Sequence, residues 1–143
     1  MHEIEVGQIL SLRIRFNNSG DISKSKHPYL VIDINEKFNF IEIAQLDSLE
    51  GKEHKALFKG NKVIFCTEPD ETVIDKDSYI QMDNTFRIEN FSGLSAFRRQ
   101  NDKLSELKLA SVLNAYKNYH DKNEISENKI VYMDQAEIMS LNN

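Results

Sequence analysis

The sequence predicts a mainly β fold of the α+β class, in which one long C-terminal helix closes a small β-barrel. About five or six short segments alternate apolar and polar side chains, and turn-forming residues separate them. Strands of this length and spacing are typical of small barrels. The segment 102–120 then contains neither glycine nor proline and carries apolar side chains at helical spacing, namely Leu109, Val112, Leu113 and Tyr116.

The first predicted strand and the loop after it form the most informative part of the chain. The strand covers residues 6–16. In it, the apolar side chains of Leu10, Leu12, Ile14 and Phe16 lie on one side and alternate with polar side chains on the other. The polar loop that follows, from Asn17 to Lys26, contains Gly20 and is longer than the usual hairpin loop of about two to five residues. Loops of this length in compact domains are often functional.

Further strands are predicted at residues 29–34 and 62–66, which are short apolar runs, at 38–46, where apolar and polar residues alternate, and at 78–82 and 85–89. Asn35-Glu36-Lys37 and Asp83-Asn84 are turn signals between neighbouring strands. Cys66, at the end of one strand, is the single cysteine, which excludes an internal disulfide and predicts a buried thiol.

The helix at residues 102–120 is expected to begin at Asp102 as its N-cap. Its apolar stripe would cover the open side of the barrel or a symmetric partner. We therefore expect one domain at residues 1–120, followed by a polar tail at 121–143 with no assigned role. That tail holds an apolar patch at 130–133 and a possible last helical turn at 136–141.

Charge and composition restrict the functional classes. The net charge of −5 argues against nucleic-acid binding by overall attraction and favours a local basic surface. Basic residues gather around the first loop, at Arg13, Arg15, Lys24 and Lys26. The start of the sequence lacks the features of a signal peptide, and no apolar run is long enough to span a membrane. We expect a cytoplasmic protein that does not associate with membranes.

His27 stands at the mouth of the most apolar predicted strand. Pro28 has no N–H for a sheet ladder and biases His27 toward an extended conformation, as at the start of a strand. A side chain here is carried by a polar loop but supported by a rigid strand, an arrangement common in functional sites.

The order of these segments resembles the PemK/MazF family of toxin ribonucleases. A glycine opens the first strand at Gly7, a polar loop follows, and the second strand begins with Lys26-His27-Pro28-Tyr29-Leu30-Val31-Ile32. The third strand ends in Ile43-Ala44-Gln45-Leu46-Asp47-Ser48. Asp77-Ser78-Tyr79-Ile80-Gln81-Met82-Asp83 and the C-terminal helix complete a resemblance that covers residues 6–119.

The resemblance implies an SH3-like or CcdB-like barrel with a C-terminal helix, usually homodimeric, which cuts single-stranded RNA without a metal or cofactor and is neutralised by an antitoxin. Two positions depart from the family pattern. His27 takes the place of an arginine that usually precedes the proline. Ser48 matches a threonine or serine at the end of the third strand, whereas Asp47 beside it is not expected there.

Cleavage of RNA by its own 2′-hydroxyl requires a base, an acid and positive charge or donors near the phosphate. Histidine suits either proton-transfer role because its unperturbed pKa is about 6.5. We expect three catalytic residues, His27, Ser48 and Asp47, where Asp47 orients His27 or reads a base amine. Expected RNA-binding residues are Lys24, Lys26, Gln45, Arg15 and Tyr29.

Two other functions compete with the nuclease. The same barrel with a non-catalytic site would bind RNA or a peptide, which the departures at His27 and Asp47 favour. A CcdB-like protein would inhibit a protein target such as a topoisomerase, and the C-terminal helix and tail would then matter more than His27. Each candidate side chain also has a structural alternative: His27 as a packing residue, Ser48 as a turn cap and the lysines as ordinary loop residues.

Overall fold

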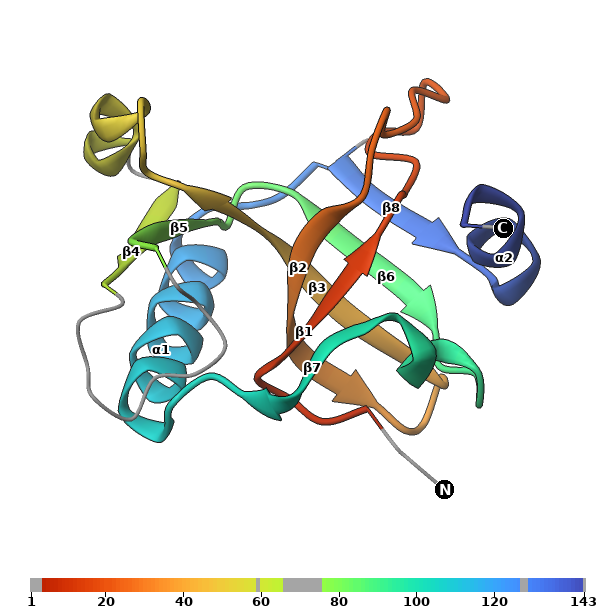
Figure 1. The fold of residues 1–143 in the computed structure, drawn as a ribbon. Helices are drawn as coiled ribbons and strands as arrows, with labels where there is room; N and C mark the ends of the chain where they lie inside the picture. The colour runs from red at the N-terminus through yellow and green to blue at the C-terminus, as the bar shows by residue number, and fades with distance from the viewer. Residues whose placement is uncertain (1–3, 59, 66–75, 127–128, 143) are drawn as a thin grey trace.

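A computed structural model describes residues 4–58, 60–65, 76–126 and 129–142. It has a mainly β architecture in which a curled, mostly antiparallel sheet is flanked by two α-helices (Figure 1). The described residues form an eight-stranded sheet made of β1 (Gln8–Leu12), β2 (His27–Asn35), β3 (Phe40–Ser48), β4 (Asn61–Ile64), β5 (Ser78–Gln81), β6 (Thr85–Glu89), β7 (Arg98–Lys103) and β8 (Ile130–Met133). The helices are α1 (Glu106–Lys122) and α2 (Gln135–Leu141), with short 3₁₀ turns η1 (Glu53–Leu57) and η2 (Leu94–Phe97).

β3 is the central strand and pairs with three neighbours among the described strands. Residues Phe40 to Gln45 pair with β2 on one side, and Phe40 to Ile43 pair with β6 on the other. From Leu46 onward β3 pairs with β5 instead. The strand therefore belongs to two parts of a curled sheet and bends between them.

Alternation along the strands produces two apolar layers. Tyr29 and Val31 of β2 face an inner core with Phe86, whereas Leu30 and Ile32 face a second core. In α1, Val112 and Tyr116 are buried against that second core, as are several residues of β1, β3, β4 and β5, namely Ile9, Ala44, Leu46, Ile64 and Ile80. The apolar stripe of the predicted helix therefore covers the sheet, and the mainly β class with a long C-terminal helix is confirmed.

The helix boundary was predicted incorrectly. α1 begins at Glu106, after Ser105, so Asp102 is not its N-cap. Residues 98–103 form β7, which pairs antiparallel with β1 through Leu10 and Arg98. The apolar stripe begins only at Leu109, and the polar residues before it therefore allowed a different structure.

Other boundaries differ by a few residues. β1 ends at Leu12, although Ile14 beyond it remains fully buried and Arg15 forms an isolated bridge with Ile22. β4 ends at Ile64, and the predicted strand end at Cys66 lies outside the described residues. Within the described ranges, none of the helices is both long and apolar enough to cross a membrane.

Residues 129–142, which the sequence left without a role, belong to the same sheet and core. β8 runs parallel to β6, so α1 lies within the connection between two parallel strands. Val131 and Met133 of β8 and Ile138 of α2 are buried in the inner core. These residues are therefore an integral part of the fold.

The C-terminal segment also fastens the end of β1 and the loop after it. Asn142 accepts a hydrogen bond from the backbone N–H of Arg13 (2.7 Å) and donates one to its carbonyl oxygen (2.9 Å). The Arg15 guanidinium forms an ion pair with Glu137 (2.7 Å) and donates to the carbonyl of Tyr132 (2.7 Å). Together these contacts, which we call the C-terminal clasp, hold the loop at residues 17–26 at its base.

Candidate nucleic-acid interface

The candidate site lies where β2 and β3 separate. The last paired residues of this hairpin are Tyr29 and Gln45. Two residues further, His27 pairs with β1 and Asp47 pairs with β5, because β3 has bent toward β5. The start of β2 and the end of β3 therefore leave a gap in the pairing, with β2 leading back to the loop after β1 and β3 leading on to η1 (Figure 1).

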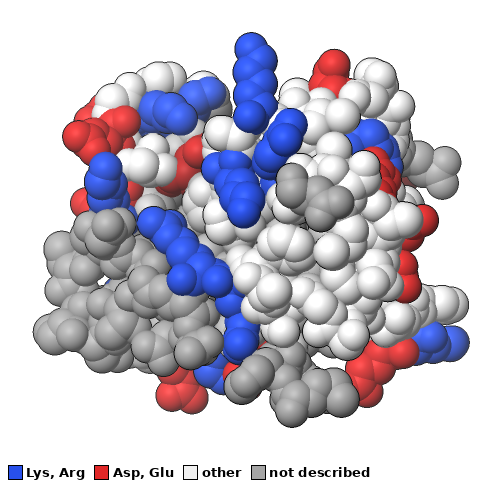
Figure 2. Space-filling view, turned by 45° about the vertical axis from the view of Figure 1, so that its right-hand side comes forward, with Lys and Arg blue, Asp and Glu red and all other residues white. Residues whose placement is uncertain are grey.

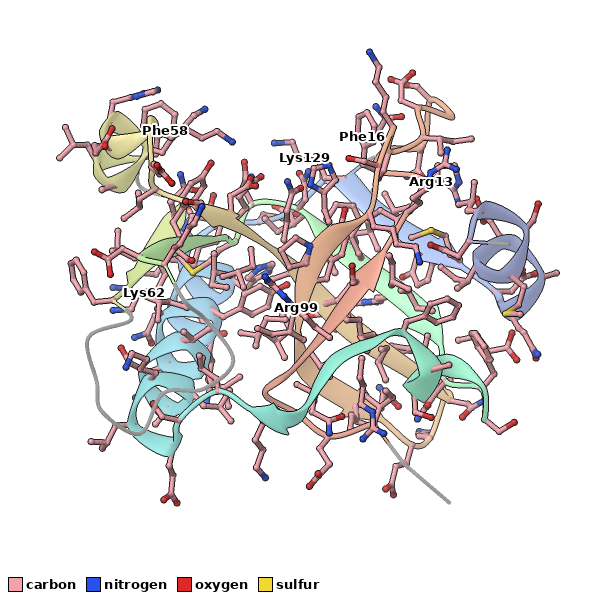
Figure 3. The ribbon with its side chains drawn as sticks, in the orientation of Figure 1. Arg13, Phe16, Phe58, Lys62, Arg99 and Lys129 are labelled. Atoms are coloured by element: carbon pink, nitrogen blue, oxygen red, sulfur yellow. The ribbon has the colours of Figure 1, made fainter. Side chains whose placement is uncertain are left out.

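A pocket of about 470 Å³ opens on one side of this gap. We call it the cationic pocket, because three of its lining residues are Lys or Arg. Its lining residues are Ser11, Lys26, Pro28, Leu46, Asp47, Ser48, Lys76, Ser78 and Arg99. Figure 3 shows the labelled Arg99 side chain extending from β7 toward the middle of the molecule.

The three cations of this pocket differ in how strongly they are neutralised. Lys76 forms an ion pair with Glu50 at 3.1 Å, and both side chains are largely exposed. Lys26 and Arg99 are exposed and have no hydrogen-bond or ion-pair partner within the described part of the chain. Figure 2 shows Lys and Arg side chains running from the top of one face of the molecule past its centre. Two unneutralised cations at one pocket favour an anionic ligand.

Two hydroxyl groups of the pocket are held in known orientations. Ser48 Oγ accepts a hydrogen bond from the backbone N–H of Glu50 at 3.1 Å, so its own hydrogen can be donated to a ligand. Ser78 Oγ donates its hydrogen to the carbonyl oxygen of Lys76 at 2.9 Å and retains an acceptor lone pair. Of the two, Ser48 is the donor suited to a phosphate oxygen.

Asp47 sits in a fixed position at the end of β3. Its Oδ2 accepts hydrogen bonds from Gln45 Nε2 (3.1 Å), Gln81 Nε2 (3.1 Å) and Tyr79 Oη (3.5 Å). No described residue donates to Oδ1. A carboxylate held through one oxygen keeps the other available as an acceptor beside the cationic pocket.

A second pocket, of about 380 Å³, adjoins the first. We call it the aromatic pocket, and it is lined by Phe16, Ile22, Ser23, Lys24, His27, Tyr29 and Gln45. The two pockets meet at two points: Lys26 and His27 are consecutive, and Gln45 of the aromatic pocket donates to Asp47 of the cationic pocket. Phe16 is 40% exposed and Ile22 is 44% exposed, so apolar surface faces the solvent here.

Tyr29 and Tyr79 indicate how the charge of Asp47 acts on its surroundings. Burial raises the pKa of Tyr29 to about 12, and the negative charge of Asp47 adds to the increase. The pKa of Tyr79 is also raised, first by burial and second by the negative charge of Asp47. Both phenols therefore stay protonated and neutral at ordinary pH, and neither suits the role of a general base.

The structure brings the predicted site residues together in two groups. Lys26, Asp47 and Ser48 line the cationic pocket. The other group, in the aromatic pocket, consists of Lys24, His27, Tyr29 and Gln45. The predicted catalytic residues His27 and Ser48 thus line adjoining pockets rather than the same one.

Two predicted RNA-binding residues have other roles. The guanidinium of Arg15 is engaged by Glu137 and by the carbonyl oxygens of Tyr132 and Asn17, in the C-terminal clasp. Tyr29 is only 1% exposed and packs edge-on against Phe86, with ring centroids 6.0 Å apart. It closes the floor of the aromatic pocket and presents no free face for stacking.

The lining residues that sequence reasoning missed include Ser11, Phe16, Lys76 and Arg99. The basic pair Arg98-Arg99 is visible in the sequence, but it falls in a polar segment whose pairing with β1 cannot be inferred locally. Phe16 was assigned to the barrel interior from its alternation, whereas the chain leaves the sheet at Leu12.

A comparison with known protein families finds no family model that matches this sequence. A comparison with curated proteins likewise finds no match. The resemblance to PemK/MazF toxins therefore stays a prediction from sequence motifs.

Proposed function

We propose that this protein is a toxin-type endoribonuclease that cleaves single-stranded RNA across the two adjoining pockets. The observation that carries the proposal is the contact between a cationic pocket and an aromatic pocket at the separated ends of β2 and β3. Single-stranded RNA is bound through stacking of unpaired bases together with charge along the backbone. An SH3-like or CcdB-like barrel is proposed with it, supported by the curled antiparallel sheet and α1.

The cationic pocket would hold the phosphodiester. Lys26 and Arg99 carry unneutralised charge, and Ser48 has a hydrogen to donate to a non-bridging oxygen. Charge accumulates on these oxygens in the transition state, and a single positioned donor contributes roughly 10²- to 10³-fold in rate. The aromatic pocket would take the base next to the cleaved bond, with Phe16 as the exposed ring.

Proton transfer is assigned to Asp47, near the end of β3, and to His27, at the start of β2. Oδ1 of Asp47 accepts the proton of the 2′-hydroxyl, and the 2′-oxygen forms a bond to phosphorus. The bond from phosphorus to the 5′-oxygen breaks, and His27 donates a proton to that oxygen. The products are a 2′,3′-cyclic phosphate and a 5′-hydroxyl. Asp47 and His27 suit this sequence because they flank the boundary between the two pockets.

The test is incubation of the protein with a labelled single-stranded RNA in EDTA, followed by analysis of fragment ends. We expect discrete fragments ending in 2′,3′-cyclic phosphate. His27→Ala and Asp47→Asn should each reduce the rate by roughly 10²- to 10⁴-fold. Lys37→Ala, in the turn at the far end of the β2–β3 hairpin, is the matched control and should cleave at the wild-type rate. Circular dichroism melts confirm that each variant is folded.

A second candidate is a module that binds RNA without cutting it. The observation that favours it is the division of His27 and Ser48 between two pockets. In the same experiment this function predicts RNA that is shifted in a gel but remains intact, with unchanged ends, in wild type and variants alike. The antitoxin and the homodimer stay predictions from the family resemblance.

A further inference from the structure

We infer that Gln45 is a specificity-determining residue that reads an adenine base in the aromatic pocket. This inference rests on the proposed function, since it assumes that an unpaired RNA base occupies that pocket. It concerns recognition only, and it holds whether or not the bound RNA is cleaved.

The orientation of the Gln45 amide is fixed by Asp47. A carboxylate accepts hydrogen bonds and donates none, so the amide group at 3.1 Å from Asp47 Oδ2 must be the NH₂ end. Oε1 of Gln45 therefore points away from Asp47. No described residue donates a hydrogen bond to Oε1, and one of the two hydrogens on Nε2 is also uncommitted.

Asp47 is itself immobilised, which prevents the Gln45 amide from rotating. Gln81 and Tyr79, both on β5, donate to the same Oδ2 at 3.1 Å and 3.5 Å. Gln45 lies on β3 opposite Tyr29, inside the sheet rather than on a loop. A recognition group on a rigid strand, with its amide held by neighbouring hydrogen bonds, is preorganised for a ligand.

Gln45 supplies the side-chain amide of the aromatic pocket, whose other polar lining residues are Ser23, Lys24, His27 and Tyr29. Ser23 Oγ donates to the carbonyl of Ile14 (3.0 Å) and accepts from the Ile14 N–H (3.2 Å). Lys24 is exposed on the loop and is not held by a strand. The walls are apolar at Phe16 and Ile22, which suits the broad face of a purine.

A side-chain amide that offers one acceptor and one donor matches adenine. Adenine presents the N6 amino group as donor and N7 as acceptor on one edge, and glutamine pairs with both. Guanine has two acceptors, O6 and N7, on that edge, and uracil has only the O4 acceptor there. On this edge the fixed Oε1 of Gln45 would face an acceptor of guanine or uracil, which disfavours both bases, and cytosine offers its N4 amino donor without an acceptor beside it.

The experiment measures dissociation constants by fluorescence anisotropy for four labelled oligonucleotides that differ only in one central base within a uridine tract. Their riboses carry 2′-fluoro groups, which remove the attacking hydroxyl and separate binding from cleavage. We expect the central adenine to bind roughly 5- to 100-fold more tightly than uracil, guanine or cytosine. Gln45→Met should reduce this preference to within about twofold.

Gln135→Met is the matched control, because Gln135 is exposed at the start of α2 and lines neither pocket. It should keep the adenine preference. Equal binding of all four oligonucleotides, a preference for another base, or loss of the preference in Gln135→Met as well as Gln45→Met would each overturn the inference. Failure of every oligonucleotide to bind would instead reject the proposed function, so the two results are distinguishable.

Discussion

Removing the two unneutralised cations of the cationic pocket should weaken the salt dependence of RNA binding by a predictable amount. Each phosphate that a protein neutralises on a single strand contributes about −0.7 to the slope of log K against log salt. Lys26 and Arg99 are unpaired among the described residues, whereas Lys76 is partly neutralised by Glu50. The wild-type slope should therefore lie between about −1.4 and −2.1.

In practice, raising the salt from about 50 to 200 mM should weaken wild-type binding roughly 7- to 20-fold. The double variant Lys26→Ala and Arg99→Ala should lose at most roughly threefold over the same range. The assay is fluorescence anisotropy with the uncleavable 2′-fluoro oligonucleotide, and Lys37→Ala is the control because it removes one positive charge at the far end of the hairpin. A double variant that keeps the wild-type slope would refute the assignment of this pocket to the phosphate backbone.

Three further predictions concern the fold around the site. Ile138→Ala, at a fully buried core position, should lower the free energy of unfolding by about 2–5 kcal/mol in urea titrations, and a loss below about 1 kcal/mol would contradict its place in the core. Because the pKa of Tyr29 rises from 10.0 to about 12 on folding, its contribution to stability is complete below pH 10 and is lost as the pH rises to 12. The free energy of unfolding should fall by roughly 2–3 kcal/mol over this pH range for this reason. Urea titrations of Tyr29→Phe should lack this fall, and a variant with the same pH profile as wild type would disprove the prediction. Gly7→Ala should destabilise more than Gly20→Ala, since both have φ near +97° (+98° and +96°) but only at Gly7 would the new Cβ lie 2.8 Å from Leu109 Cδ2. The two variants should differ by about 1–3 kcal/mol in their free energy of unfolding, measured by thermal or urea unfolding. Equal losses of stability would show that Leu109 on helix α1 moves aside at no cost.

The parts of the fold that the sequence predicted are those whose pattern is local. β2 contains the continuous apolar run Tyr29 to Ile32, β3 has partly alternating apolar and polar residues, and a turn signal separates the two. β6 was located with its exact bounds, Thr85–Glu89. β7 was missed because its residues, Arg98 to Lys103, are all polar and become a strand only through pairing with β1. That pairing joins residues separated by nearly two thirds of the chain, such as Leu10 and Arg98, and leaves no periodicity in the segment itself.

The candidate site was likewise predictable only where neighbouring elements of the sequence bring its residues together. Asp47 and Ser48 end β3 and Lys26 directly precedes β2, so their proximity follows from the β2–β3 hairpin. Arg99 and Lys76 reach the same pocket from β7 and from the residue pair before β5, which no hairpin connects to the others. The division between His27 and Ser48 depends on the bend of β3 after Gln45, a tertiary feature without a local sequence signal.

The C-terminal clasp has a consequence for how the protein is made. Asn142 binds both backbone groups of Arg13, which lies 129 positions earlier, and Glu137 holds Arg15. During translation the strands β1 to β7 leave the ribosome well before these partners do. The wall of the aromatic pocket is therefore anchored only after residues 137–142 have been synthesised and have left the ribosome.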